Sequence, residues 1–199
     1  GVRTRALITA MDVPLGLAVG NAIEVTESLE VLAGGGPADL IELVIALANE
    51  MLDIAGINAD PREAITSGRA MDHWRRMISA QGGDPDAPLP VARHQHVITA
   101  PVAGPLSTLE AYGVGVAAWR LGAGRAHKED EIIHGAGVQL HAKPGDMLSK
   151  GQPIMTLLAA DEARLSAAIA ELEGSWEIGG EPMDRHPLVI TRFDENTRG

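Results

Sequence analysis

The sequence contains no cysteine, and aromatic residues make up only 3% of its 199 residues. The lack of cysteine excludes disulfide bonds, thiolate metal sites and a cysteine nucleophile, and it agrees with a reducing cytoplasm, where we expect the protein to reside. Because aromatic rings are so few, the interior must be built mainly from aliphatic side chains and methionine. Stacking platforms for single-stranded nucleic acid are therefore not expected.

Positive charge and long apolar runs are also scarce. The formal net charge is -11, and the longest block of basic residues is Arg75 with Arg76. A nucleic-acid backbone requires a basic patch, so nucleic acid is not an expected partner. No apolar run approaches the roughly 20 residues that a membrane span needs, so we expect no membrane partner either.

The chain opens with Gly1 rather than methionine, and a short apolar run follows within residues 2–10. This continuous pattern is typical of a strand that is covered on both faces in a mainly parallel sheet. Such a strand needs neighbours on both sides. We therefore expect the chain to continue a longer parent protein, in which the neighbouring strands lie.

Two longer helices are predicted in the first part of the chain. Apolar residues recur at helical spacing over Asn21–Leu32, and the glycines at 34–36 end that helix. A second helix, over Pro37–Gly56, carries a wide apolar stripe after a proline that suits a first helical turn. Asp60 and Pro61 then predict the capped start of a shorter helix.

Residues 83–90 are rich in glycine, proline and aspartate, a composition that indicates a linker. We place the domain boundary there, so that 1–82 ends a mixed α/β sheet domain. Residues 91–199 form a C-terminal α+β domain of antiparallel strands with packed helices, two of them predicted at 108–121 and 161–173. The predicted fold class is therefore α/β plus α+β.

Six strings along the chain carry a resemblance to a known family. They are, in order, ALITAMDVPLGLAVGNAIEV, GPADLIELVIALANEMLDIAG, MISAQGG, VITAPVAG, LGAGR and GVQLHAKPGDMLSKGQP. Their sequence and spacing resemble thymidine phosphorylases and the related pyrimidine-nucleoside phosphorylases over nearly the whole chain. The resemblance implies that 1–82 is the C-terminal portion of the large α/β domain and that 91–199 is the C-terminal domain.

The resemblance implies a pentosyltransferase, a glycosyltransferase of pyrimidine-nucleoside salvage. Its substrates would be phosphate and thymidine or another pyrimidine nucleoside, and its products the free base and (2-deoxy-)α-D-ribose 1-phosphate. In that family the phosphate loop and the base-binding residues would lie in segments before Gly1. This chain has no lysine before Lys128 and no glycine loop with Ser or Thr that could cradle phosphate. We therefore assign no catalytic or cofactor-binding residue and expect the chain alone to be inactive.

One functional position follows from the resemblance. It implies that the backbone carbonyls of Leu15 and Ala18, with the carboxylate of Glu27, bind a monovalent cation, K+. Carbonyl and carboxylate oxygens suit hard cations, and the remaining ligands would lie beside the phosphate loop. Without the resemblance, Glu27 is interpreted as a solvated helix residue, because isolated glutamates are rarely buried. The resemblance also implies a homodimeric parent enzyme.

Two alternatives from other functional classes remain open. TAPVAG followed by KPGDMLSKGQPIMTL is similar to the strands and turns of biotinyl or lipoyl carrier domains, whose lysine stands at a hairpin tip. Similar architecture does not establish function, and we expect Lys128, Lys143 and Lys150 to stay unmodified. The chain could also act as a non-catalytic scaffold module.

The remaining polar motifs are interpreted as structural. The seven histidines do not occur at metal-binding spacing such as H-E-x-x-H. The string LGAGR could form an anion nest, but it lies outside a dinucleotide-binding context, so we interpret it as a turn.

Overall fold

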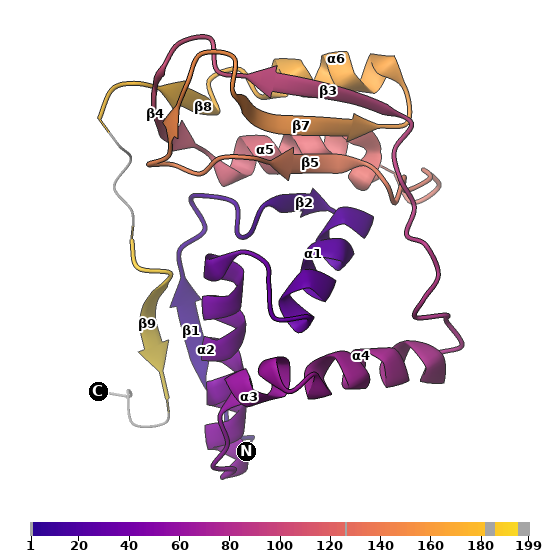
Figure 1. Cartoon of the computed structure of the whole chain (residues 1–199), viewed down its shortest axis with the longest axis vertical. Coiled ribbons are helices and arrows are strands. Elements are labelled where there is room, and N and C mark those ends of the chain that lie inside the picture. The colour runs from indigo at the N-terminus through magenta and orange to yellow at the C-terminus, as the bar shows by residue number, and fades with distance from the viewer. Residues whose placement is uncertain (1, 126, 182–185, 195–199) are drawn as a thin grey trace. The chain divides into compact units, whose positions relative to one another are not determined.

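The computed structural model describes residues 2–125, 127–181 and 186–194. These residues form two compact units, whose elements are labelled in Figure 1. Unit 1 contains the described residues of 1–10, 28–87 and 185–199, and unit 2 contains those of 11–27 and 88–184. The chain therefore contributes two separate segments to unit 2.

Unit 1 is mainly helical. Its elements are β1 (Ala6–Thr9), the last part of α1 (Ala22–Leu32), α2 (Ala38–Ala55), α3 (Pro61–Thr66), α4 (Arg69–Ala80) and β9 (Val189–Phe193). The two predicted longer helices are confirmed to within one residue at each end. Gly56 ends α2 with a left-handed φ of 69°, and its N–H donates to the Asp53 carbonyl at 3.2 Å. Asp60 caps α3 as predicted, since its Oδ1 accepts a hydrogen bond from Arg62 N at 2.9 Å.

The first strand has an antiparallel neighbour in this chain, which the sequence did not predict, while the neighbours expected from the rest of the parent protein stay a prediction. In the described part of the chain, β1 pairs with β9, and the pairing is antiparallel, with Ala6 opposite Phe193. Its side chains alternate between exposed and half-buried, and Ile8 is 48% exposed. The apolar run predicted cover on both faces of a parallel strand, but the described residues cover only one face.

Four charged side chains connect this pair of strands to α2. Arg5 lies 3.0 Å from both Glu50 and Asp53, while Arg192 of β9 lies 2.8 Å from Glu50 and 3.5 Å from Asp53. Hydrogen bonds to Asp53 and then to Glu50 raise the pKa of Arg5 above its usual value. These ion pairs connect α2 both to the segment before β1 and to β9, which come from opposite ends of the chain.

Unit 2 contains two antiparallel sheets and two helices. Its elements, besides the first part of α1, are β2 (Ala18–Gly20), β3 (His94–Thr99), β4 (Gly104–Leu109), α5 (Ala111–Ala118), the wide helical turn η1 (Trp119–Ala123), β5 (Gly137–Leu140), β6 (Met147–Leu148), β7 (Pro153–Ala159), α6 (Glu162–Glu171) and β8 (Trp176–Ile178). One sheet has the order β2-β5-β7-β3 and the other the order β6-β4-β8. The predicted mixture of helices and antiparallel strands in the C-terminal part is thus confirmed.

The helix predicted over 108–121 begins later than expected. Thr108 and Leu109 belong to β4, where they lie opposite Glu177 and Trp176 of β8. Leu109 is fully buried, so pairing with a distant strand determines the local structure there. The last helix follows its prediction more closely, because Asp161 caps α6 by accepting a hydrogen bond from Arg164 N at 3.0 Å.

The core of unit 2 lies between its strands and its two helices. In Figure 1, α5 and α6 lie beside β3, β5 and β7, and α6 packs against both α5 and β7. Leu106, Val114, Leu157 and Ala168 are fully buried in this core. Their burial provides the hydrophobic stabilisation that holds the surrounding loops in place.

The segment 11–27 joins this unit through β2, which pairs with β5. The division predicted from the linker at 83–90 stays a prediction, and the two compact units cross it at 11–27 and at 185–199. Among the described helices, none combines the length and the apolar character that spanning a bilayer requires.

Candidate functional site

The turn that precedes α1 is closely wrapped around the carboxylate of Glu27. Gly16 has a left-handed φ of 65°, and Leu17 N donates to Glu27 Oε1 at 2.7 Å. A Cβ atom added to Gly16 would lie 2.2 Å from Glu27 Oε2. A glycine is therefore required here both for its backbone conformation and for the space that the carboxylate occupies.

The backbone carbonyls of this turn fall into two groups. The carbonyl of Pro14 accepts a hydrogen bond from Lys143 Nζ, and that of Leu17 accepts from Leu140 N at 2.7 Å and from Gln139 Nε2 at 3.0 Å. The carbonyl of Leu15, in contrast, receives no hydrogen bond from the part of the chain that the structure describes. Its lone pairs are thus not used by the described residues.

The Ala18 carbonyl, like that of Leu15, receives no hydrogen bond from β5, because of the position of Ala18 in the pairing of β2 with β5. In an antiparallel pair, residues that exchange hydrogen bonds alternate with residues that point these groups away from the partner strand. The bond from Leu140 N to Leu17 assigns Ala18, which lies opposite Gln139, to the second kind. Since β2 is an edge strand of the sheet that the structure describes, the Ala18 carbonyl points toward the side of β2 on which no described strand pairs.

Glu27 is buried, with only 8% of its surface exposed. This differs from the solvated helix residue that its sequence context alone suggests. A buried carboxylate requires hydrogen bonds and a compensating positive charge. Leu15, Ala18 and Glu27 all lie in the segment 11–27, which belongs to unit 2, and their joint role as ion ligands stays a prediction.

Three contacts fix this segment onto the rest of unit 2, none of which the sequence revealed. Asn21 Nδ2 donates to the Ala123 carbonyl at 2.6 Å, and Ala22 N donates to the His134 carbonyl at 2.9 Å. A Cβ atom on Gly20 would lie 2.6 Å from the Ala136 carbonyl oxygen. Gly20 and Asn21 therefore attach this segment to the rest of unit 2. In the sequence, only their place within the string AVGN could have pointed to this role.

The LGAGR string ends a helix. Gly122 has a φ of 108° within η1, and its carbonyl accepts a hydrogen bond from Ile133 N at 2.9 Å. Gly124 leaves room for an indole ring, because a Cβ atom there would lie 2.7 Å from Trp119 Cδ1. The string thus forms a compact turn over an aromatic side chain, in agreement with its interpretation as a turn.

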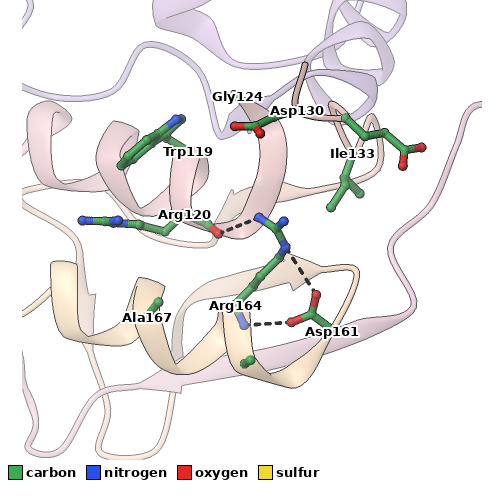
Figure 2. A pocket seen from close by; sticks show the side chains of 10 residues that line it. Trp119, Arg120, Gly124, Asp130, Ile133, Asp161, Arg164 and Ala167 are labelled. Carbon is green, nitrogen blue, oxygen red and sulfur yellow. Dashed lines mark hydrogen bonds and ion pairs between the residues drawn. The ribbon is translucent and has the colours of Figure 1, made fainter. Parts of the chain in front are cut away.

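A pocket of about 620 Å³ lies beside this turn, between η1 and the start of α6. Figure 2 shows Arg164 between the Arg120 carbonyl, 3.4 Å from its Nη1, and Asp161, which lies 3.3 Å from its Nε. The Arg120 guanidinium lies 4.6 Å from the centre of the Trp119 ring and 2.8 Å from Glu171. Both arginines are thus bonded to protein groups at the wall of this pocket.

The histidines and lysines do not form a second centre. Within the described residues, no group of three His, Asp or Glu side chains could hold a metal ion. Lys150 is exposed in a turn, whereas Lys143 is half-buried and bonded to the Pro14 carbonyl. A lysine that displays a biotinyl or lipoyl group would have to break such a bond.

The chain is similar to known phosphorylases over almost its full length. Residues 106–179 match the family described as the pyrimidine nucleoside phosphorylase C-terminal domain. The thymidine phosphorylase of Mycobacterium tuberculosis (strain ATCC 25618 / H37Rv) is 49% identical over 194 residues, which cover 97% of this chain and 45% of that protein. The pyrimidine-nucleoside phosphorylase of Bacillus subtilis (strain 168) is 40% identical over 204 residues, covering 95% of this chain and 47% of that protein.

A further relative extends the pattern. The pyrimidine-nucleoside phosphorylase of Staphylococcus haemolyticus (strain JCSC1435) is 39% identical over 191 residues, which cover 89% of this chain and 44% of that protein. The chain thus spans about half the length of the curated relatives it matches. With these matches, the chain belongs to the family of thymidine phosphorylases and pyrimidine-nucleoside phosphorylases and carries that family's C-terminal domain.

Proposed function

We propose that this chain is the C-terminal part of a thymidine or pyrimidine-nucleoside phosphorylase. In the complete enzyme, phosphate and a pyrimidine nucleoside would be converted to the free base and (2-deoxy-)α-D-ribose 1-phosphate. The observation that carries the proposal is the 49% identity to a thymidine phosphorylase over 97% of the chain. Such a pentosyltransferase would be a cytoplasmic homodimer of nucleoside salvage, with domains that divide at 83–90.

The chemistry of phosphorolysis explains why the chain should depend on the rest of the enzyme. A developing oxocarbenium ion and a departing base anion need cationic and hydroxyl donors around both phosphate and base. The chain has no lysine before Lys128, and both arginines of its pocket are bonded within the protein. We therefore propose that this part supports the active site without supplying catalytic residues.

Its direct contribution would be the turn around Glu27. The carbonyls of Leu15 and Ala18, together with the Glu27 carboxylate, would bind K+ in the complete enzyme. Three features support this assignment: the Leu15 carbonyl receives no hydrogen bond from the described residues and the Ala18 carbonyl lies on the side of β2 away from β5, the carboxylate is buried, and Gly16 leaves space for it. Hard oxygen ligands of this kind suit an alkali cation. The ion would hold the turn in one shape beside the phosphate site.

The first test is an assay of the purified 199-residue chain. We expect no phosphate-dependent release of thymine from thymidine, or of uracil from uridine. The thymidine phosphorylase of Mycobacterium tuberculosis, purified from the same host in the same way, serves as the positive control. Release of base that follows the chain through every purification step, and is absent from mock preparations, would contradict the proposal.

A further inference from the structure

Lys143 reaches the same turn as Glu27 from another part of unit 2. Its Nζ donates a hydrogen bond to the Pro14 carbonyl, while Glu27 Oε1 accepts one from Leu17 N. A cationic and an anionic side chain thus hold the two ends of the segment 14–17. Lys143 is half-buried and Glu27 is buried, so both charges lie where solvent screens them poorly.

The backbone of Lys143 is itself fixed. Its N–H donates to Asp146 Oδ2 at 2.8 Å, and its carbonyl accepts a hydrogen bond from Asp146 N at 3.0 Å. Gly145 N donates to the Leu106 carbonyl at 2.8 Å, which attaches the turn to a fully buried residue of β4. The KPGD string therefore presents its lysine from a rigid base rather than from a flexible loop.

The ammonium group resembles the expected ion in charge and in ligand preference. It carries one positive charge, has no acceptor, and binds carbonyl and carboxylate oxygens. A buried carboxylate is costly unless a positive charge compensates it. At this turn the positive charge is that of Lys143, whose ammonium group donates a hydrogen bond to the Pro14 carbonyl, next to the predicted ion ligand Leu15.

We propose that Lys143 is a tethered cation that takes over part of the role of K+ at this turn. This inference rests on the proposed cation site and adds its regulation. When no ion is bound, the Lys143 ammonium compensates the charge of Glu27 and holds the carbonyls in place. The residue therefore determines how strongly the protein depends on dissolved potassium, and it acts as a positioning residue, not as a catalytic one.

The first experiment needs no potassium. Thermal unfolding of the chain is measured in tetramethylammonium chloride for wild type, Lys143→Met, Glu27→Gln and the double variant. We expect Lys143→Met to lower Tm by about 5 °C, because it removes a positive charge from the turn that surrounds a buried carboxylate. In the Glu27→Gln background the same change should cost less than about half as much. An equal loss in both backgrounds would overturn the proposal.

The second experiment places the same variants in a chimera, in which this chain replaces the corresponding part of the thymidine phosphorylase of Mycobacterium tuberculosis and the remaining ion ligands would be present. Tetramethylammonium is then replaced by K+ at constant ionic strength. We expect K+ to raise the Tm of Lys143→Met by at least about twice the rise seen for wild type, because the ion takes the place of the lost ammonium. If Lys143→Met folds only in the presence of K+, whereas the double variant also folds without K+, this result likewise supports the exchange between ion and ammonium. An equal rise in both proteins would overturn the interchange.

The controls separate this inference from the proposed function. Lys150→Met makes the same chemical change in the next turn, where the side chain is exposed, and should leave Tm and its response to K+ unchanged. Lys143→Arg keeps the charge and should lose less stability than Lys143→Met. If K+ stabilises none of the variants, the cation site of the proposed function fails, and with it the exchange between ion and ammonium. If K+ acts on wild type but no more strongly on Lys143→Met, only the role of Lys143 fails.

Discussion

At the scale of single residues, the chemistry of the chain centres on Glu27 and the glycine beneath it. The Glu27 carboxylate occupies the space that a Cβ atom at position 16 would need, so only glycine fits there. Leu17 N donates a hydrogen bond to the same carboxylate. A solvated helix glutamate would make neither contact. The residue is thus a structural part of the turn, independently of the proposed ion.

Glu27→Gln should weaken the hold of the complete enzyme on K+ while leaving the helix almost unchanged. Glutamine has nearly the same helix propensity and keeps an oxygen for Leu17 N, but it removes the negative charge. We expect the K+ concentration for half-maximal phosphorolysis to rise about tenfold, a change of about 1.4 kcal/mol in binding. The rate is measured against K+ at constant ionic strength.

Glu30→Gln is the matched control, since Glu30 is exposed on the same helix. Its dependence on K+ should equal that of wild type. If wild type shows no dependence on K+, or if Glu27→Gln responds as wild type does, the cation assignment is wrong.

At the scale of elements, the two glycines of LGAGR have different tasks. Gly122 provides the backbone conformation at the end of η1, with a φ of 108°. Gly124 has an ordinary extended backbone and is required only because Trp119 lies against it. The two tasks make the cost of a substitution predictable at each position.

Gly124→Ala should lower Tm of the chain by about 3 °C, because the added methyl group forces the Trp119 ring to move. Gly115→Ala is the comparison, since no atom lies within 4 Å of a Cβ added at that helical position. It should be neutral or stabilising by about 0.5 to 1 kcal/mol, owing to the better helix propensity of alanine. Equal effects of the two changes would show that Trp119 does not constrain Gly124.

The elements also show how far local sequence signals reach. The bounds of α2 were predictable because Pro37 and Gly56 mark its ends and an apolar stripe runs between them. The pairing of Ala18 with Gln139 was not, because no local pattern reports contact with a residue so distant in the chain. For the same reason the start of α5 was predicted too early, where Leu109 instead pairs with β8.

In the candidate site, too, local features could be predicted from the sequence, whereas contacts between distant residues could not. The resemblance supplied the ligand positions at Leu15, Ala18 and Glu27, and the hydrophobic pattern located the helix that carries Glu27. The bond from Lys143 to Pro14 joins residues more than 100 positions apart, and the burial of Glu27 arises only in the folded structure, so the local sequence could not predict either.

At the scale of the whole molecule, the segment 11–27 does not belong to the unit formed by the residues around it in the sequence. It belongs to unit 2, so the turn that would hold the ion is built on the same unit as the matched C-terminal domain. The chain spans about half the length of its curated relatives. The proposed ion ligands Leu15, Ala18 and Glu27 therefore belong to the same compact unit as the residues that match the C-terminal domain.

The claim that this chain is the C-terminal part of a phosphorylase can be tested with a chimera. This chain replaces the corresponding C-terminal part of the thymidine phosphorylase of Mycobacterium tuberculosis, to which it is 49% identical. If the chain is the C-terminal part of such an enzyme, the chimera should release thymine from thymidine with phosphate at a rate within about tenfold of the parent, a barrier change of at most about 1.4 kcal/mol. A chimera that unfolds as cooperatively as the parent, yet releases no thymine, would contradict the claim.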